Sequence, residues 1–181
     1  MDMKDVERVL ISEEELKQIC KDLGKQISKD YEGKKLYLVS VLKGAVVFMA
    51  DLLREITCDC QIDFLAVSSY SGAKTTGVVK FKKDLDINPD GCDILIVEDI
   101  LDSGVTLSYL KKVLEGRGAK SIKICTLLDK ATNRIADIEA DYVGKVIPDE
   151  FVIGYGLDYD EKYRNLPFVG VLAPHVYSDG E

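Results

Sequence analysis

The chain has 181 residues, of which 46% are hydrophobic and 31% are charged, and its formal net charge is -8. This balance is typical of one folded domain over residues 1–181 and excludes a disordered chain. An acidic chain without a basic stripe is not expected to bind nucleic acid. The longest apolar stretch, residues 36–53, is interrupted by Lys43 and Asp51, so no membrane partner is expected. Five scattered cysteines and the absence of a signal peptide favour a cytoplasmic protein with free thiols.

The first half of the chain predicts helices that alternate with strands. Ser12 and Glu15 form a capping box, and the apolar residues that follow recur at helical spacing up to Ile27. The continuous apolar run over residues 36–42 is typical of a buried strand. A helix is predicted over residues 45–56 and strands over residues 62–68 and 78–81. Between these two strands, residues 69–77 are rich in serine, glycine and threonine, and they are predicted to form a mobile loop.

The second half continues the alternation. Residues 88–91 read Asn-Pro-Asp-Gly, which predicts a turn. Strands over residues 93–97 and 122–128 then flank a helix over residues 105–115. This order predicts an α/β fold with a mostly parallel sheet. Residues 142–155 are predicted to form short strands in a small hood.

The most informative stretch is residues 94–106, ILIVEDILDSGVT. An apolar strand is predicted to end at the adjacent carboxylates Glu98 and Asp99, and a turn of small polar residues leads into a helix. Ligands of open α/β sheets lie beyond the carboxyl ends of the strands, and the N–H groups at a helix N-terminus suit a phosphate. Carboxylates would repel that phosphate unless they bind sugar hydroxyls or hold Mg²⁺. The stretch therefore predicts a site for a phosphorylated ribose. The alternative is an acidic loop that only caps the helix.

This stretch resembles the phosphoribosyl pyrophosphate (PRPP) binding signature of type I phosphoribosyltransferases. Further motifs are similar to those of the bacterial hypoxanthine-guanine branch of this family, over a span from Ile11 to Leu172. These motifs are Leu42-Lys43-Gly44, Ser69-Tyr70, Lys130, Phe151-Val152, the segment from Gly154 to Tyr159, and Arg164. The resemblance implies a twisted, mostly parallel sheet flanked by helices. It also implies a hood formed by the N- and C-terminal segments and a flexible active-site loop that contains Ser69 and Tyr70.

The resemblance implies an enzyme of purine salvage. It would transfer the 5-phosphoribosyl group of PRPP to hypoxanthine or guanine and release pyrophosphate. Asp102 would be the general base, while Glu98 and Asp99 would bind the ribose hydroxyls and a Mg²⁺ ion, and Asp158 a second Mg²⁺ ion. The phosphate-binding turn would consist of Asp102, Ser103, Gly104, Val105 and Thr106. Some family members carry a lysine at the position of Val105, so this turn is expected to use only backbone N–H groups and hydroxyls.

Pyrophosphate would be bound by Lys43, Gly44 and Arg164, and in the family the peptide bond between Leu42 and Lys43 is often cis. Elementary chemistry supports these roles, because positive charge grows on the ribose during transfer while negative charge grows on the leaving pyrophosphate. Carboxylates near the sugar and cations near the leaving group stabilise both charges. A loop over residues 69–77 that closes over the site would exclude water from the reactive sugar.

The resemblance assigns the purine base to Lys130, Phe151, Val152 and Asp158. An ammonium donates hydrogen bonds and accepts none, so Lys130 suits the 6-oxo group of hypoxanthine or guanine and disfavours adenine. Phe151 would stack on the purine ring, while the backbones of Val152 and Asp158 would read its Watson–Crick side. Without the neighbouring motifs, Lys130 would be interpreted as a solvated surface lysine and Phe151 as a core residue.

Two other functions are compatible with the same motifs. One is a PRPP-sensing regulator that binds nucleic acid, but the acidic charge and the presence of Asp102, Lys130 and Arg164 favour the enzyme. The other is a phosphoribosyltransferase that prefers xanthine, since xanthine shares the 6-oxo group. The resemblance also implies a homodimer or homotetramer, in which the helix over residues 45–56 serves either the core or an interface.

Overall fold

A computed structural model describes residues 3–69 and 79–178 of the chain. Its longer elements are β1 (Val6–Ile11), α1 (Glu13–Asp30), β2 (Leu36–Leu42), α2 (Val46–Glu55), β3 (Cys60–Ser69), β4 (Val79–Lys83), β5 (Asp93–Leu101), α3 (Val105–Gly116), β6 (Ser121–Asp129), β7 (Tyr142–Val146), β8 (Val152–Ile153) and β9 (Val169–Leu172). Short 3₁₀ helices cover Met3–Asp5, Ala131–Asn133 and Pro174–Val176. Residues 70–77 of the predicted loop lie outside the described residues, whereas Ser69, predicted as its first residue, ends β3.

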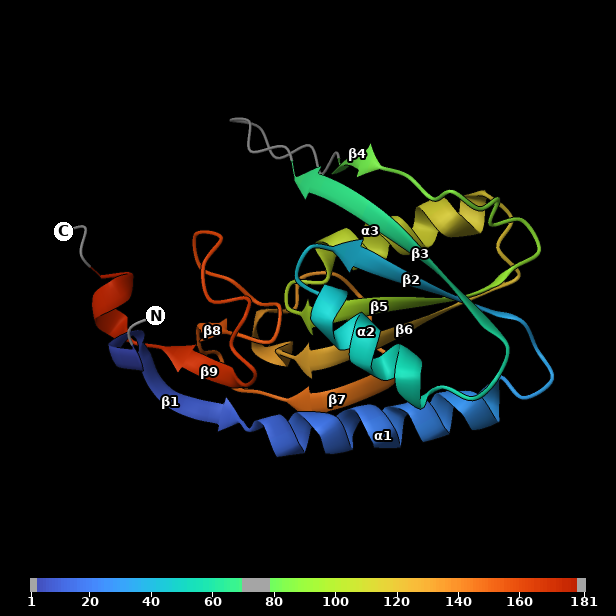
Figure 1. Cartoon of the computed structure of the whole chain (residues 1–181). Helices are drawn as coiled ribbons and strands as arrows, with labels where there is room; N and C mark the ends of the chain where they lie inside the picture. The colour runs from blue at the N-terminus through green and yellow to red at the C-terminus, as the bar shows by residue number, and fades with distance from the viewer. Residues whose placement is uncertain (1–2, 70–78, 179–181) are drawn as a thin grey trace.

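The main sheet has six strands in the order β4-β3-β2-β5-β6-β7. Five of them run parallel, and the edge strand β4 is antiparallel to β3. The mostly parallel α/β sheet expected from the sequence is therefore confirmed. Figure 1 shows that the carboxyl ends of β2, β5, β6 and β7 all point toward the same side of the molecule.

Helices cover both faces of this sheet. Helices α1 and α2 share one apolar cluster that includes Leu95 and Val97 of β5. Helix α3 packs into a second cluster, on the other face, that includes Ile94 and Ile96. Because successive side chains of a strand point to opposite faces, a strand buried on both sides must be continuously apolar. Residues 94–97 meet this requirement, since all four are fully buried.

Helix α1 begins as the sequence predicted. The Ser12 side chain accepts a hydrogen bond from the Glu15 N–H at 3.2 Å, and the Glu15 carboxylate accepts one from the Ser12 N–H at 2.8 Å. This capping box satisfies two of the N–H groups that the first helical turn leaves without a helical partner. The buried face of α1 carries Leu16, Cys20 and Ile27, which the apolar spacing had indicated.

The predicted hood strands over residues 142–155 require a correction. Strand β7 pairs in parallel with β6 and so extends the main sheet. Tyr142 is buried there, and its hydroxyl donates to Asp30 of α1 at 2.7 Å. Strand β8 belongs instead to a separate antiparallel sheet of order β1-β9-β8. Strand spacing alone does not reveal which sheet a short segment joins, because either sheet satisfies its hydrogen bonds.

The small sheet lies beyond the carboxyl ends of the main strands (Figure 1). Strand β9 is at its centre and pairs with β1 on one side and with β8 on the other. The segments near the two ends of the chain therefore form one hood over this side of the molecule. Among the described residues, none of the helices is long and apolar enough to cross a membrane.

Candidate functional site

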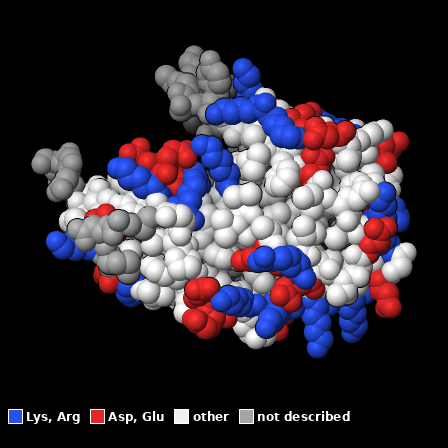
Figure 2. Space-filling view, viewed as in Figure 1, with Lys and Arg blue, Asp and Glu red and all other residues white. Residues whose placement is uncertain are grey.

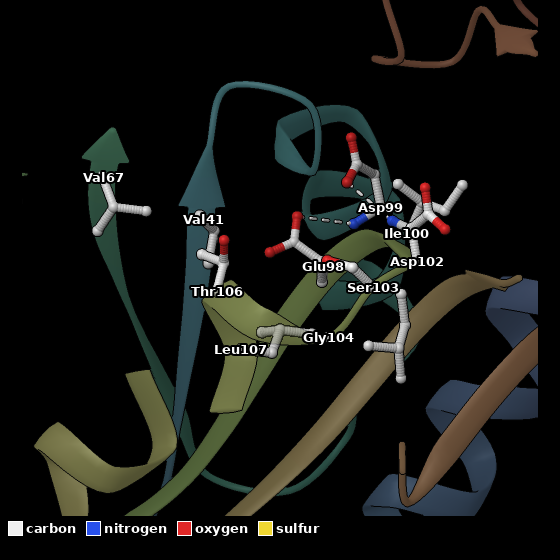
Figure 3. Close-up of a pocket in the computed structure, with 11 residues that line it drawn as sticks. Val41, Val67, Glu98, Asp99, Ile100, Asp102, Ser103, Gly104, Thr106 and Leu107 are labelled. Carbon is white, nitrogen blue, oxygen red and sulfur yellow. Dashed lines mark hydrogen bonds between the residues drawn. The ribbon is translucent and has the colours of Figure 1, made fainter. Parts of the chain in front are cut away.

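A cavity of about 340 Å³ opens at the carboxyl end of β5 (Figure 3). It is lined by Val41, Val67, Glu98, Asp99, Ile100, Leu101, Asp102, Ser103, Gly104, Thr106 and Leu107. The cavity thus contains the acidic pair, the small polar turn and the start of α3. Its place at the ends of parallel strands is the usual ligand position in open α/β sheets.

Strand β5 is longer than the sequence predicted, because it continues through the two carboxylates to Leu101. Ile100 and Leu101 still pair with Leu128 and Asp129 of β6. Glu98 and Asp99 are therefore held in regular strand backbone, and the predicted strand end at residue 97 was wrong. The apolar pattern breaks where the side chains become charged. The backbone hydrogen bonds between strands do not depend on side-chain polarity, so the strand continues past this point.

The acidic pair lies in a strongly desolvated part of the cavity. Burial and the adjacent Asp99 charge raise the pKa of Glu98 well above its ordinary value. Burial also raises the pKa of Asp99, although hydrogen bonds with Glu98 and backbone N–H groups oppose the rise. In Figure 3, Asp99 lies between Glu98 and Asp102 along the cavity rim. Asp99 is buried and Glu98 is partly buried. Two neighbouring carboxylates that resist ionisation fit a divalent cation, because its charge would stabilise both ionised forms.

The turn after β5 forms a tight concave backbone. Gly104 has φ +75°, and a Cβ atom there would lie 2.5 Å from Cγ2 of Ile138. Only glycine fits this position without strain. Helix α3 begins at the next residue. Its first N–H groups therefore have no partner within the helix, and they lie at the helix end that is next to the cavity. Ser103, Gly104 and Thr106 line the cavity as expected, while the Val105 side chain is exposed.

Lys130 follows β6 and lies close to Asp102, one of the residues that line the cavity. Its ammonium lies 3.8 Å from a carboxylate oxygen of Asp102 and 3.2 Å from one of Asp149. It also donates to the backbone carbonyl of Glu150 at 3.2 Å. Only 11% of the Lys130 side chain is exposed. Lys130 is therefore not the solvated surface lysine that its position alone would suggest. Within the described residues, the Asp102 Oδ1 atom is buried and has no hydrogen-bond partner.

Sequence reasoning missed Arg134, which holds the turn from behind. Its Nε donates to the Asp102 carbonyl at 2.8 Å, and its Nη2 donates to the Leu101 carbonyl at 3.3 Å. Its Nη1 donates to the Ile138 carbonyl at 2.7 Å, and it forms an ion pair with Asp129. An arginine in a polar loop resembles any surface arginine. The sequence therefore carries no signal for this role.

The hood contributes Phe151 and Val152. Val152 is buried in β8, whereas Phe151 is 45% exposed just before it. The Phe151 ring stacks on Tyr177, with centroids 5.8 Å apart, and meets the edge of Tyr159 at 5.4 Å. Sequence reasoning missed Tyr177, because nothing near it predicts a return to residue 151. One aromatic group of three residues therefore lies at the hood.

A third part of the site surrounds Arg164. Its guanidinium donates to the Gly156 carbonyl at 2.8 Å and pairs with Asp158 at 2.8 Å. Gly156 itself packs on residue 44, since a Cβ at Gly156 would lie 2.1 Å from the Gly44 carbonyl oxygen. A Cβ at Gly44 would lie 1.7 Å from an Asp99 carboxylate oxygen. The two glycines thus bring the segment around Arg164, the turn after β2 and the acidic pair into direct contact.

The remaining predicted residues are placed as follows. Lys43 follows β2, is 65% exposed and pairs with Glu161 at 3.0 Å, and the peptide bond before it is cis. Asp158 pairs with Arg164 and is not part of the acidic pair. Within residues 3–69 and 79–178, no group of three or more His, Cys, Asp or Glu side chains forms a cation site of its own. Ser69 is the last residue of β3, and Tyr70 lies outside the described residues.

Comparisons with known proteins agree with this arrangement of sheet, turn and hood. Residues 10–160 match the phosphoribosyl transferase domain family. A hypoxanthine-guanine phosphoribosyltransferase of Staphylococcus aureus is 53% identical over 97% of this chain and 98% of its own length. The bifunctional protein TilS/HprT of Listeria monocytogenes is 52% identical, and the chain spans 27% of its length.

Solved structures give the same result. A hypoxanthine phosphoribosyltransferase from Staphylococcus aureus superposes with a TM-score of 0.94 at 52% identity, over 97% of this chain and 96% of that one. A hypoxanthine-guanine phosphoribosyltransferase from Bacillus anthracis gives 0.89 at 49% identity, over 93% and 99%. The chain belongs to the phosphoribosyltransferase family and, within it, to the hypoxanthine-guanine phosphoribosyltransferases, as the sequence motifs indicated.

Proposed function

We propose that the chain transfers the 5-phosphoribosyl group of PRPP to hypoxanthine or guanine and yields the nucleoside 5′-monophosphate and pyrophosphate in purine salvage. The observation that carries this proposal is the pairing of Lys130 with Asp102, 3.8 Å apart, at the turn between β5 and α3. The names of the relatives support the choice of hypoxanthine and guanine.

The sugar phosphate would bind at the turn of Asp102, Ser103, Gly104, Val105 and Thr106. Three features support this assignment: the positive φ of Gly104, the N–H groups at the start of α3 that have no partner within the helix, and the hydroxyls of Ser103 and Thr106 in the cavity. The exposed Val105 side chain offers no charge, so its backbone N–H would take part in the binding. A dianionic phosphate at this helix end gains from the helix dipole as well as from hydrogen bonds.

Asp102 would accept the proton that the purine ring nitrogen loses during transfer. Its side chain is 43% exposed, and its buried Oδ1 atom has no hydrogen-bond partner among the described residues, so the carboxylate has acceptor capacity that the fold does not use. Lys130 would donate to the 6-oxo group of the base, while Phe151 would stack on the ring and the Val152 and Asp158 backbones would bind its edge. An adenine amino group would present a donor to the Lys130 ammonium and leave both groups without an acceptor.

Glu98 and Asp99 would bind the ribose hydroxyls and share a Mg²⁺ ion with the substrate, and Asp158 would hold a second ion. Bound Mg²⁺ would neutralise the pyrophosphate oxygens and make pyrophosphate a better leaving group. Because this chain offers only a pair of neighbouring carboxylates at β5, water and PRPP would supply the other ligands. Lys43, Arg164 and the Gly44 backbone would bind the pyrophosphate, and the loop with Ser69 and Tyr70 would exclude water.

The proposal also includes a cytoplasmic location and a homodimer or homotetramer. All five cysteines are free thiols, which suits a reducing compartment. On the face viewed in Figure 2, uncharged side chains cover part of the middle of the molecule and are bordered by groups of both charges. Sedimentation velocity would measure the oligomeric state directly.

The test is a spectrophotometric assay with PRPP and Mg²⁺ in which hypoxanthine, guanine, xanthine, adenine and uracil are compared. We expect turnover of hypoxanthine and guanine, and a loss of turnover when Mg²⁺ is chelated. Asp102→Asn should lower kcat by about 10²- to 10⁴-fold and leave PRPP binding intact, because it removes a proton acceptor without removing the turn. Turnover of xanthine alone, or of none of the bases, would contradict the proposal.

A further inference from the structure

The carboxylate of Glu161 lies where the two proposed pyrophosphate-binding cations converge. One oxygen, Oε2, accepts a hydrogen bond from the Lys43 ammonium at 3.0 Å and from Nη2 of Arg164 at 3.3 Å. Lys43 follows β2 of the main sheet, whereas Arg164 belongs to the segment that packs on Gly44. One acidic side chain therefore connects the two cations from separate parts of the fold.

Arg164 does not need Glu161 to hold its position. Its Nη1 donates to the Gly156 carbonyl at 2.8 Å, and its Nη2 also pairs with Asp158 at 2.8 Å. Its Nε atom is buried and has no hydrogen-bond partner among the described residues. The guanidinium is thus fixed by two contacts that do not involve Glu161.

The backbone of Glu161 is fixed, whereas its side chain is largely exposed. It has φ +60°, and its N–H donates to the Asp158 carboxylate at 2.9 Å, so the backbone of this turn is fixed. Its side chain is 64% exposed. An exposed carboxylate loses little when it leaves an ion pair, because water solvates it and such pairs contribute little. The pair with Lys43 is therefore easily exchanged for another anion.

We propose that Glu161 is an internal counter-anion that competes with pyrophosphate for Lys43 and Arg164. This inference rests on the proposed function, in which these two cations bind the pyrophosphate. Its Oε2 atom takes the place of one oxygen of that ligand, so the carboxylate must move away before pyrophosphate or PRPP binds. When the product leaves, Glu161 returns to the cations. The residue thereby weakens product binding and sets the affinity of the pyrophosphate subsite.

The test compares the affinity of inorganic pyrophosphate, at fixed Mg²⁺, for the full chain and for Glu161→Gln by isothermal titration calorimetry. We expect the variant to bind pyrophosphate about threefold to tenfold more tightly, since two exposed ion pairs no longer have to be broken. The matched control is Asp160→Asn, because Asp160 is 79% exposed and pairs only weakly with Lys162, at 3.7 Å, among the interactions described. This control should bind pyrophosphate as the wild type does.

Two further measurements separate competition from a structural role. The affinity for the nucleoside 5′-monophosphate product should be unchanged in Glu161→Gln, because that ligand is assigned to other residues. In a Lys43→Met background, the effect of Glu161→Gln should shrink, since one of the two competing contacts is already lost. Equal or weaker pyrophosphate binding by Glu161→Gln, with normal hypoxanthine turnover, would overturn the role of Glu161 and leave the proposed function standing. If the wild type failed to bind pyrophosphate, the assignment of Lys43 and Arg164 would fail, and the role of Glu161 with it.

Discussion

The ammonium of Lys130 lies 3.8 Å from the carboxylate of Asp102, although the two residues belong to segments that follow different strands, β5 and β6. Parallel neighbours end at the same edge of a sheet, so residues far apart in sequence meet there. A second contact fixes the approach, because the Lys130 N–H donates to the Leu101 carbonyl at 3.0 Å. The proposed proton acceptor and the proposed base-reading donor thus belong to two backbone segments that are joined by a hydrogen bond.

Lys130→Gln should change which base the chain accepts. A glutamine amide carries an oxygen that accepts a hydrogen bond from the adenine amino group, whereas an ammonium accepts none. We expect the ratio of kcat/KM for hypoxanthine to that for adenine to fall by about tenfold or more. The matched control is Asp149→Asn, which removes an exposed partner of Lys130 and keeps the ammonium. A ratio that stays the same in Lys130→Gln would contradict the assignment.

Arg134→Met should weaken PRPP binding indirectly, because Arg134 supports the turn and is not assigned to the ligand. The arginine supports the carbonyls of Asp102, Leu101 and Ile138, and its loss would release the turn. We expect KM for PRPP to rise by about tenfold or more, because small displacements of a binding turn are costly. Arg134→Lys keeps the positive charge but not the planar guanidinium that donates to three carbonyls. It should therefore show most of the same rise in KM for PRPP. A normal KM in both variants would show that the turn holds its shape alone.

Gly104→Ala should damage both the fold and the phosphate site. The new methyl group would approach Ile138 within 2.5 Å, in a backbone conformation with φ +75°. We expect a loss of about 1–3 kcal/mol in the free energy of unfolding, measured by urea denaturation. Gly116→Ala is the comparison, because a Cβ there meets nothing within 4 Å. Equal stability of the two variants would refute the steric argument.

Asp63 should make stability depend on pH. Its buried carboxylate accepts from the N–H groups of Phe64, Asp86 and Ile87 at 2.7–3.1 Å, and it pairs with Lys83. Burial raises its pKa, but these donors outweigh burial and hold the pKa below its ordinary value. A lowered folded-state pKa stabilises the fold above the unfolded pKa of about 4. This contribution is lost as the pH falls through the folded-state pKa.

Urea unfolding of Asp63→Asn at two pH values checks this. We expect the variant to be about 1–3 kcal/mol less stable than the wild type at pH 7. The difference should shrink toward about pH 3, because the carboxyl of the unfolded wild-type chain is then protonated and unfolding becomes more favourable. Asp86→Asn serves as the control, since the Asp86 side chain is 83% exposed. A difference that is the same at both pH values would contradict the linkage.

Much of the main sheet and the position of the turn before α3 could be predicted from the sequence, because both leave local signals. A buried parallel strand such as β5 is a continuous apolar run, and the turn before α3 has a specific composition. The contacts that complete the site leave no such signal. Arg134 and Glu161 are charged residues in polar loops, and only the three-dimensional fold reveals what they bind. The pairing of β7 with β6 likewise depends on tertiary packing, which outweighs the local pattern.

The pairing of β1 with β9 has a consequence for which part of the chain folds last. Val6 pairs with Leu172, so the hood joins residues from opposite ends of the described chain. The entropy lost in closing so long a loop is recovered only after the main sheet has brought the ends near each other. The hood should therefore form last and open first, with amide hydrogens of β8 and β9 exchanging faster than those of β5. The residues of the hood that are proposed to bind the purine base would then lose their positions while the turn after β5 is still folded.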